Sequence, residues 1–536
     1  MRKIIALVLC MLLTIPAFTA FAQNADNLSG TITISLQSVT GAQEAWTAVA
    51  NAYTAKHPNV NVVVDLKPSG NYTDWLKAQF QSWSTDHYPE PDLVVGNLAG
   101  SDKNDKTVNF FNYSDEKSPY SDGRWSDQFI NFSKQPAIDI NNGNWDVLGT
   151  FSTQILWFYN ADIFREVGVK PPTTWNELID VCEKLQQAGY QPIAIGGDLQ
   201  SFWELQMGWL VQVYTDQTTR STINIVRAQP GDYNYDEDID GKFKYDPTDP
   251  YNDDTPANVT VNGLRFWRGL MIDGTLRGDT EGMKTVMSNL AKVFPKYAGG
   301  DKFFGTSMEG ARTLFYQGKA AMYVDTSGFL GDYLIVKKSI DEDKAIVVGS
   351  GDNQVGLTGL KKFDLQTFHM PSMEGPGIEA KARTLEVSTG FISAVKKEVD
   401  HNDLVVDFLM YFTSPEGFST WVNALIGAGG HIDGKPLIKG VELKGELATL
   451  LDNIPFIGNC QKGVGVNLAR GIGDNQEAVR AWYGYTKDFF DGKITVDEWA
   501  EKHQANLLKY APEVLKVSKI SMRDLENPQN EATGND

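Results

Sequence analysis

The stretch that decides the fold is "ILWFYNADIFREVGVKPPTTWNELIDVCEKL", residues 155–185. Its first five residues are apolar or aromatic without polar alternation, which predicts a strand buried on both faces. Asn160 can cap a short helix that ends at Gly168. Thr174 and Glu177 have the spacing of a capping box, and apolar residues at helical spacing predict a second helix after them. "QPIAIGG", residues 191–197, then returns to a strand, so the order is strand, helix, helix, strand.

Upstream of this stretch the same alternation continues. Residues 31–36 and 60–66 have strand patterns, residues 42–57 and 74–83 have helix patterns, and "PDLVVG" from Pro91 predicts a short buried strand. Strands that alternate with helices predict parallel sheets covered by helices. Ligands of such sheets bind beyond the carboxyl ends of the strands.

Three segments break the alternation. Residues 101–144 and 216–258 are polar and rich in Asn, Asp and Ser, which predicts two surface insertions. The tail after Arg523, "DLENPQNEATGND", has almost no apolar residues and is predicted to be disordered.

The N-terminus has the pattern of a cleavable export signal. Arg2 and Lys3 precede an apolar run, and small residues end at Ala22, so the mature chain is expected to begin near Gln23. The run is shorter than the roughly 20 residues that span a bilayer, and no later segment is long and apolar enough to do so. We expect a soluble protein outside the cytoplasm. Lipid attachment at Cys10 is the less favoured alternative, because Leu9 precedes it.

The net charge of the chain limits the partners that it can bind, and its cysteine content bears on whether it forms a disulfide. The signal contains two of the 48 basic residues and none of the 68 acidic ones, so the mature chain has a formal charge of −22. Such a surface repels nucleic acid and anionic membranes. Of the two cysteines left after cleavage, Cys182 lies on the apolar side of a predicted helix. A buried thiol is favoured there over a disulfide with Cys460.

The segment from "LWFYNADIFREVGV" to "QPIAIGG" resembles the signature segment of bacterial extracellular solute-binding proteins of sugar ABC importers, the maltodextrin-binding type. "FYQGKAAMYVDTSGF" is similar to the second block of that family. "GFISAVKK", followed by "VVDFLMYFTSPEGFSTWV", resembles its third block. The resemblance covers most of the mature chain, and the two insertions exceed the compact members of the family.

The resemblance implies a two-lobed α/β fold, the periplasmic-binding-protein type II fold, with a sheet flanked by helices in each lobe and a hinge between them. Lobe 1 would comprise residues 23–150 and 387–453, and lobe 2 residues 151–386 and 454–523, after a signal peptide at 1–22 and before a tail at 524–536. Hinge crossings are placed at residues 149–152, 386–389 and 453–455.

Binding of a neutral sugar needs flat aromatic faces and planar polar groups on rigid elements. Phe202 and Trp203 follow a predicted strand and a polar turn, beyond a carboxyl end, where ligand stacking is favoured over core packing. Glu204 could accept sugar hydroxyls or be a solvated acid at a helix start. The family resemblance implies cleft positions for Gln37 and Ser38 and for Asn97, although Asn97 could equally be a turn residue.

The resemblance also places Thr150 and Phe151 at the hinge, and Asp325 and Phe329 after a strand where relatives often carry a tryptophan. Gly427, Gly429 and Gly430 mark a loop whose backbone could approach ligand, with a simple turn as the favoured interpretation.

An acidic motif lies in the second insertion. In "DEDIDGKFKYD", Asp236, Asp238 and Asp240 stand at positions 1, 3 and 5 of a calcium loop of the EF-hand type. Position 12 is Pro247, where a bidentate Glu is required. A solvated acidic hairpin is therefore favoured over a calcium site, and no other cofactor is expected.

The leading hypothesis is a monomeric extracytoplasmic receptor, in the periplasm or at the cell surface, that binds a sugar between its lobes and delivers it to an ABC permease. An oligosaccharide is expected because of the signature blocks and the length of the chain. There is no G-x-S-x-G elbow, no H-E-x-x-H and no Cys pair at zinc spacing, so an enzyme is not expected. Two alternatives are a secreted carbohydrate-active hydrolase or lyase, and the same fold with a non-sugar cargo.

Overall fold

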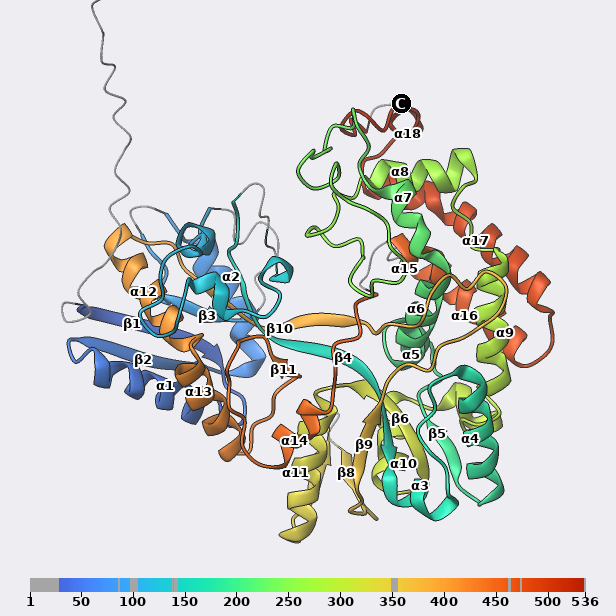
Figure 1. Cartoon of the computed structure of the whole chain (residues 1–536), viewed down its shortest axis with the longest axis horizontal. Coiled ribbons are helices and arrows are strands. Elements are labelled where there is room, and N and C mark those ends of the chain that lie inside the picture. The colour runs from blue at the N-terminus through green and yellow to red at the C-terminus, as the bar shows by residue number, and fades with distance from the viewer. Residues whose placement is uncertain are drawn as a thin grey trace, which may run out of the picture.

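The protein is described from a computed structural model that covers residues 28–84, 87–96, 105–136, 138, 143–348, 355–460, 464–472 and 475–534. Asn97 and the predicted export signal lie outside these residues. The chain folds into two α/β lobes joined by two long strands, β4 (Leu148–Asn160) and β10 (Glu386–Ala394) (Figure 1). The two-lobed fold that the sequence predicts is confirmed.

Lobe 1 is built on a sheet in the order β2-β1-β3-β10-β4. Its parallel strands are β1 (Gly30–Gln37), β2 (Val60–Lys67) and β3 (Leu93–Val95), and β10 runs antiparallel to β3 and β4. Helices α1 (Ala42–Lys56), α12 (Val399–Phe412) and α13 (Pro415–Gly427) pack against one another on one side of this sheet, and α2 (Tyr72–Gln81) packs with Val94 on the other.

Lobe 2 continues from the second half of β4. That half pairs with β6 (Ala320–Thr326) on one edge and with β9 (Leu365–Phe368) on the other, and β5 (Gln191–Ala194) pairs parallel to β6. The helices around this sheet are α3 (Ala161–Val167), α4 (Trp175–Gln187), α5 (Leu199–Trp203), α6 (Gln206–Thr219), α9 (Glu281–Val293), α10 (Met308–Tyr316), α11 (Phe329–Asp341), α16 (Gln476–Phe490) and α17 (Val496–Val517).

The stretch that decides the fold has the predicted local structure. Asn160 accepts hydrogen bonds from the backbone N–H groups of Asp162 and Ile163, and Thr174 and Glu177 form the capping box of α4. The strand before them is longer than predicted. It begins at Leu148, because residues 148–154 pair with β10 before residues 155–160 pair with lobe 2.

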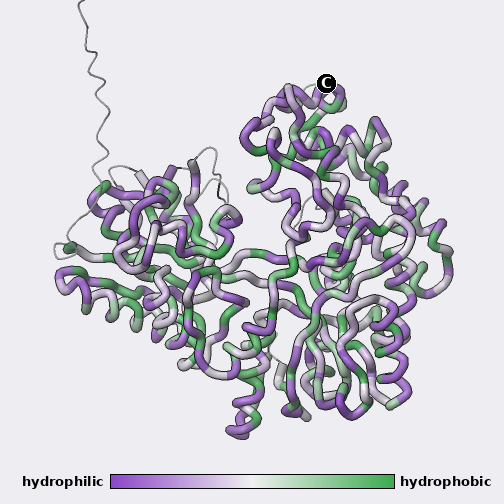
Figure 2. Tube along the Cα trace, in the orientation of Figure 1, coloured by the Kyte–Doolittle hydropathy of each residue, from purple (hydrophilic) through white to green (hydrophobic). Residues whose placement is uncertain are grey.

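Four apolar clusters of the described residues support this framework. One extends from the helices of lobe 1 to α10 and α11, a second fills the other side of the lobe 2 sheet, and a third lies under the C-terminal end of the chain. A fourth lies between α2 and the lobe 1 sheet. Hydrophobic stretches follow the strands at the centre of both lobes in Figure 2. Cys182 and Cys460 are both buried and unpaired, so they form no disulfide.

The first insertion is not only a surface feature. Phe110 and Trp125 are fully buried, and both rings pack against Trp145 at centroid distances of 5.6 and 5.0 Å. The described residues 105–136 therefore complete the core of lobe 1. Its polar composition reflects the turns between these aromatic anchors.

The tail also differs from the sequence prediction. Helix α18 (Met522–Glu526) buries Leu525 completely, and the Asp524 carboxylate accepts hydrogen bonds from Thr533 and Gly534. The side chain of Asn262 donates to the carbonyl oxygen of Pro528. Residues 524–534 are therefore packed against Asn262 and Arg268, which follow the second insertion, instead of being disordered.

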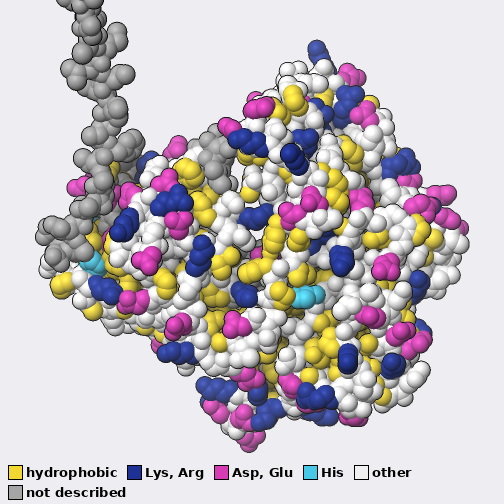
Figure 3. Space-filling model, in the orientation of Figure 1, with side chains coloured by type: hydrophobic (Ala, Val, Ile, Leu, Met, Phe, Trp, Pro, Cys, Tyr) yellow, Lys and Arg dark blue, Asp and Glu magenta, His cyan; other side chains and the backbone are white. Residues whose placement is uncertain are grey.

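No helix within the described ranges is both long enough and apolar enough to cross a bilayer. Acidic and basic side chains are interspersed over the face of the molecule that Figure 3 shows.

Candidate functional site

The carboxyl ends of the strands of both lobes meet at the β4–β10 pair. β1 ends at Gln37 and β6 at Thr326, and the predicted crossings 149–152 and 386–389 lie opposite each other in the β4–β10 ladder. Successive side chains of a strand point to opposite faces. We call the face with Phe151, Thr153, Val387 and Thr389 the strand-end face, and the face with Ser152, Gln154, Glu386 and Ser388 the rear face.

Residues 429–434 connect the two lobes at the strand-end face. A Cβ atom on Gly430 would lie 2.6 Å from the carbonyl oxygen of Thr40, in the loop after β1, so only glycine fits there. At the other end of the segment, the Asp433 carbonyl oxygen accepts hydrogen bonds from Ser327 Oγ at 2.7 Å and Thr153 Oγ1 at 3.3 Å. The segment thus spans the distance between the end of β1 and the end of β6.

Several groups with spare surface lie around this segment. The side chains of His431 and Asp433 are about half-exposed, and Val39 is 58% exposed. Thr389 is half-buried, whereas Thr153 is buried and its hydroxyl lies 2.9 Å from that of Thr389. A hydroxyl, a carboxylate, an imidazole and an aliphatic face suit a ligand that carries both hydroxyls and C–H surface.

Sequence reasoning missed Thr389, His431 and Asp433, and the buried Thr153 beside them. The glycines of "GAGGHIDG" were the available signal, because Gly429 and Gly430 mark the segment that carries His431 and Asp433. The two threonines carry no local signal, since their position depends on the pairing of β4 with β10.

Three aromatic residues predicted to contact ligand are core residues. Phe202 is 0% exposed and packs among Phe303 and Trp482. Phe151 packs on α13, and Phe329 packs on Phe158. For Phe202 the structure shows the core alternative that the sequence had left open, and none of these rings offers a face to a ligand in this arrangement.

Two polar residues predicted to contact ligand are buried and form hydrogen bonds within the protein. Thr150 is buried and donates a hydrogen bond to the carbonyl oxygen of Gly390. The Asp325 carboxylate is 2% exposed and accepts hydrogen bonds from Arg312 at 2.8 Å and Tyr323 at 2.7 Å. Burial raises the pKa of Asp325, and the guanidinium of Arg312 opposes that rise. These groups hold β6 and α10 together.

The remaining predicted residues are accessible. Gln37, Ser38 and Glu204 are exposed, and Trp203 is half-buried at the end of α5. They stay predictions for ligand contact.

The acidic motif of the second insertion forms turns and not a metal site. Asp236 Oδ1 accepts hydrogen bonds from the backbone of Asp238 and Ile239, and Asp240 accepts from Asp236 and Thr260. The Asp238 carboxylate pairs with Lys242. Within the described residues, no group of three or more His, Cys, Asp or Glu side chains could hold a metal ion. Each carboxylate serves its own turn or ion pair, an arrangement that agrees with the acidic hairpin favoured by the sequence over a calcium site.

Comparison with known proteins identifies the family. The sequence matches the bacterial extracellular solute-binding protein family over residues 37–417. The chain belongs to this family. No curated protein matches the chain in sequence.

Solved structures share the solute-binding protein fold with this chain. RafE from Streptococcus pneumoniae, in its apo form, is 14% identical with a TM-score of 0.53, covering 91% of this chain and 100% of its own. The solute receptor AcbH is 14% identical with a TM-score of 0.51, covering 92% and 99%. The cyclic alpha-maltosyl-1,6-maltose binding protein from Arthrobacter globiformis is 12% identical with a TM-score of 0.50, covering 91% and 100%.

A cavity of about 410 Å³ in this solute-binding protein is lined by residues of both lobes. Residues 130–136 of the first insertion line one wall, residues 251–257 of the second insertion line the other, and the start of β10, with Glu386 and Val387, forms the floor. The Lys134 ammonium crosses between the walls to Asp253 Oδ1 at 3.1 Å, Asp253 Oδ2 at 3.2 Å and Thr255 Oγ1 at 3.1 Å. This ion pair joins the two lobes behind the β4–β10 pair.

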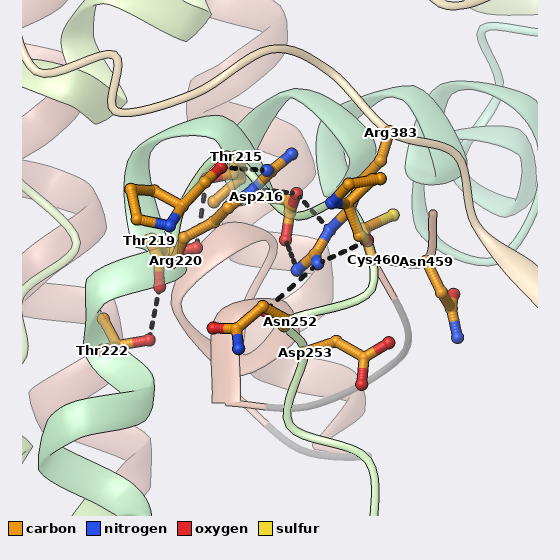
Figure 4. Close-up of polar contacts among 12 residues, drawn as sticks. Thr215, Asp216, Thr219, Arg220, Thr222, Asn252, Asp253, Arg383, Asn459 and Cys460 are labelled. Atoms are coloured by element: carbon orange, nitrogen blue, oxygen red, sulfur yellow. Dashed lines mark hydrogen bonds and ion pairs between the residues drawn. The ribbon is translucent and has the colours of Figure 1, made fainter. Parts of the chain in front are cut away.

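The second wall is held in place by two buried arginines (Figure 4). Arg383 binds both oxygens of Asp216, at 2.9 and 2.7 Å, and Arg220 donates to Asp216 at 3.1 Å. Their remaining N–H groups donate to the carbonyl oxygens of Pro250 and Pro247, each at 3.1 Å. The cluster thereby fastens the second insertion to α6.

Proposed function

We propose that this protein is the extracytoplasmic receptor of an ABC importer and that it binds a sugar between its lobes at the strand-end face. Membership of the solute-binding protein family over residues 37–417 carries this proposal. The cargo class is supported by two proteins that share the fold, one named for binding cyclic alpha-maltosyl-1,6-maltose and one for an exclusive preference for β-D-galactopyranose. We propose an oligosaccharide as the cargo and a permease as the recipient.

The strand-end face offers the groups that such a ligand needs. Thr389 from β10, Asp433 from the connecting segment and Gln37 from β1 can exchange hydrogen bonds with hydroxyls. Val39 can cover C–H surface. These groups lie where the two lobes meet, so a ligand that contacts them and the facing lobe binds one lobe arrangement better than others and shifts the population toward it.

The proposed cycle breaks no bond. A closed, loaded receptor would be selected by the permease, and opening would release the sugar. The crossings at 149–152, 386–389 and 453–455 are proposed as the hinge, because the sheets of the two lobes share β4 at the first two of them.

A thermal-shift screen of the purified mature chain against mono- and oligosaccharides tests the function. A binding sugar should raise the melting temperature and be recovered unchanged by chromatography. Thr389→Val should weaken the binding of that sugar, because it removes a half-buried hydroxyl and keeps the shape of the side chain. Glu309→Leu, on the exposed side of α10, should not.

Formation of new reducing ends or unsaturated products would contradict a receptor and indicate an enzyme. Stabilisation by a non-sugar cargo alone would agree with a solute-binding protein but would contradict a sugar as its cargo.

A further inference from the structure

The two insertions contact each other from different lobes through one side chain. The Lys134 ammonium of the first insertion donates to three oxygen atoms of the second, Asp253 Oδ1 at 3.1 Å, Asp253 Oδ2 at 3.2 Å and Thr255 Oγ1 at 3.1 Å. The Asp253 side chain is fully buried, whereas 23% of the Lys134 side chain is exposed. A carboxylate buried in lobe 2 is therefore neutralised by a cation that belongs to lobe 1.

Lys134 is held next to the first crossing between the lobes. The following residue, Gln135, is buried and forms two hydrogen bonds with the backbone of Gly149. Its Oε1 accepts from the Gly149 N–H at 2.9 Å, and its Nε2 donates to the Gly149 carbonyl oxygen at 3.2 Å. A Cβ atom on Gly149 would lie 2.8 Å from the ring of Pro136, so this close approach requires glycine. The backbone that carries Lys134 therefore moves with the start of β4.

Asp253 is held as firmly on lobe 2. Its Oδ1 accepts hydrogen bonds from Thr255 Oγ1 at 2.6 Å and from Asn258 Nδ2 at 2.7 Å. Shortly before it in the chain, the buried Arg383 donates to the carbonyl oxygen of Pro250 at 3.1 Å. The Asp253 carboxylate points away from this arginine (Figure 4). Its own turn therefore presents the carboxylate to the first insertion.

Burial distinguishes this contact from another ion pair between the lobes. Lys337 of α11 and Glu446 of α14 (Glu446–Asp452) pair at 2.9 Å below β4 in Figure 1, with 33% and 53% of their side chains exposed. Ion pairs on the surface contribute little to stability. Removal of one partner from a buried pair is costly, because the other charge stays without compensation. Separation of Lys134 from Asp253 should therefore cost much more than separation of Lys337 from Glu446.

We infer that Lys134, Asp253 and Thr255 form a latch that holds the two lobes at one angle when no ligand is bound. One half of the latch is mounted on the first crossing and the other on lobe 2, so a rotation about the proposed hinge breaks it. The latch thereby limits the fraction of ligand-free molecules in which the lobes have moved apart. This inference rests on the hinge of the proposed function but not on its cargo.

Double electron–electron resonance on the full mature chain without sugar tests the latch. Spin labels at Asp122→Cys in the first insertion and Lys244→Cys in the second, both at exposed positions, report the distance between the insertions. The native Cys182 and Cys460 are buried. The labelled protein with an intact latch should give one narrow distance distribution. Lys134→Met should raise the fraction of molecules outside that distribution at least about fivefold, because it removes the cation from a buried pair.

Lys337→Met is the matched control, since it makes the same chemical change in the exposed ion pair, and it should leave the distribution unchanged. Asp253→Asn keeps an acceptor for Thr255 and should act like Lys134→Met. The double variant should not exceed either single variant, because both changes break the same contact. Should Lys134→Met fail to fold, as judged by thermal unfolding, Asp253→Asn decides alone.

Distributions of Lys134→Met and Asp253→Asn that coincide with that of the intact latch would overturn the inference. A broad distribution in the protein with an intact latch would overturn it as well. A sugar screen that yields no ligand would defeat the proposed cargo alone, because the distance measurements use no sugar.

Discussion

Phe202 and Trp203 are neighbours on the same five-residue helix, yet their surroundings differ. Phe202 is enclosed by aromatic rings of α16 and of the segment before α10, whereas Trp203 keeps part of its ring accessible. The Trp203 carbonyl oxygen accepts a hydrogen bond from Arg470, which fixes the end of α5. Whether Phe202 or Trp203 can contact a ligand therefore depends on which of the two rings the backbone directs toward solvent.

Trp203→Ala should weaken binding of the cargo sugar by about 1–3 kcal/mol, because a ring that stacks on a buried sugar supplies energy of that order. This corresponds to a roughly 5- to 150-fold rise in Kd, measured by calorimetry. Glu309→Leu is the control. An unchanged Kd for Trp203→Ala would remove this residue from the binding site.

His503 links stability to pH. Its ring is fully buried, accepts a hydrogen bond from Tyr485 at Nδ1 and donates from Nε2 to the carbonyl oxygen of Leu468. Burial lowers the pKa of His503 to about 4. Between the unfolded value of about 6.5 and about 4, the unfolded chain binds a proton that the folded chain does not, so stability falls as the pH falls.

At pH 5 this residue should cost about 2 kcal/mol of folding stability relative to pH 7.5. Urea unfolding at both pH values measures the difference, which His503→Gln should reduce by that amount. His87→Gln, on an exposed position, should leave it unchanged. Equal pH dependence in the wild type and in His503→Gln would refute the assignment.

At the scale of elements, α18 shows how a polar sequence can still pack. Its single apolar anchor, Leu525, is enclosed in the third core cluster, and Asp524 gathers backbone N–H groups from Ser521, Thr533 and Gly534. These hydrogen bonds hold the pKa of Asp524 well below its usual range against the opposing effect of burial. The element is stabilised by hydrogen bonds that composition alone does not reveal.

Leu525→Ala should reduce the free energy of unfolding by about 2–5 kcal/mol, the cost of a cavity at a fully buried leucine. Met522→Ala on the same helix, where the side chain is 46% exposed, should change it by less than about 0.5 kcal/mol. Denaturant titration compares the two. Similar small effects would show that α18 is detached in solution.

The arginine cluster gives a second prediction for an element. Arg383→Met should destabilise the protein by about 3 kcal/mol and expose residues 247–252 to proteases, because it breaks a buried ion pair and releases the backbone of the insertion. Lys242→Met, which removes an exposed ion pair with Asp238, should cost less than about 1 kcal/mol. Denaturation and limited proteolysis measure both, and an uncleaved insertion in Arg383→Met would contradict the proposed anchoring.

Local signals made the elements of residues 155–185 predictable, because Asn160, Thr174 and Glu177 act within their own turns. The first half of β4, "LGTFSTQ", was not predictable as buried strand. Its small and polar residues are buried only because β10, more than 200 residues later, pairs with them. The burial of Phe202 and Asp325 likewise depends on Trp482 and Arg312, whose proximity no local pattern encodes.

At the scale of the whole molecule, the lobes touch on both faces of the crossing strands. On the strand-end face, the Asp433 carbonyl oxygen joins Thr153 to Ser327, and on the rear face Lys134 joins Asp253. A rotation that separates the lobes on one face brings them together on the other. The affinity for cargo therefore depends on contacts on both sides of the hinge.

Saturating cargo should change the small-angle scattering profile of the whole chain and lower its radius of gyration, because the proposed ligand lies between the lobes. The Thr389→Val variant at the same sugar concentration should show a smaller fraction of the change. Profiles that coincide with and without cargo, at concentrations where calorimetry shows saturation, would contradict closure.

The shared strands also have a consequence for biosynthesis. β1, β2 and β3 are complete by Val95, but the sheet they belong to lacks its next strand until Ala394 has been made. The early part of the chain must therefore wait with an unpaired sheet edge, the kind of edge that favours aggregation. The sheet of lobe 1 can be completed only when nearly three quarters of the chain has been synthesised. Until then, we expect the nascent chain to avoid aggregation by remaining unfolded or by binding a chaperone.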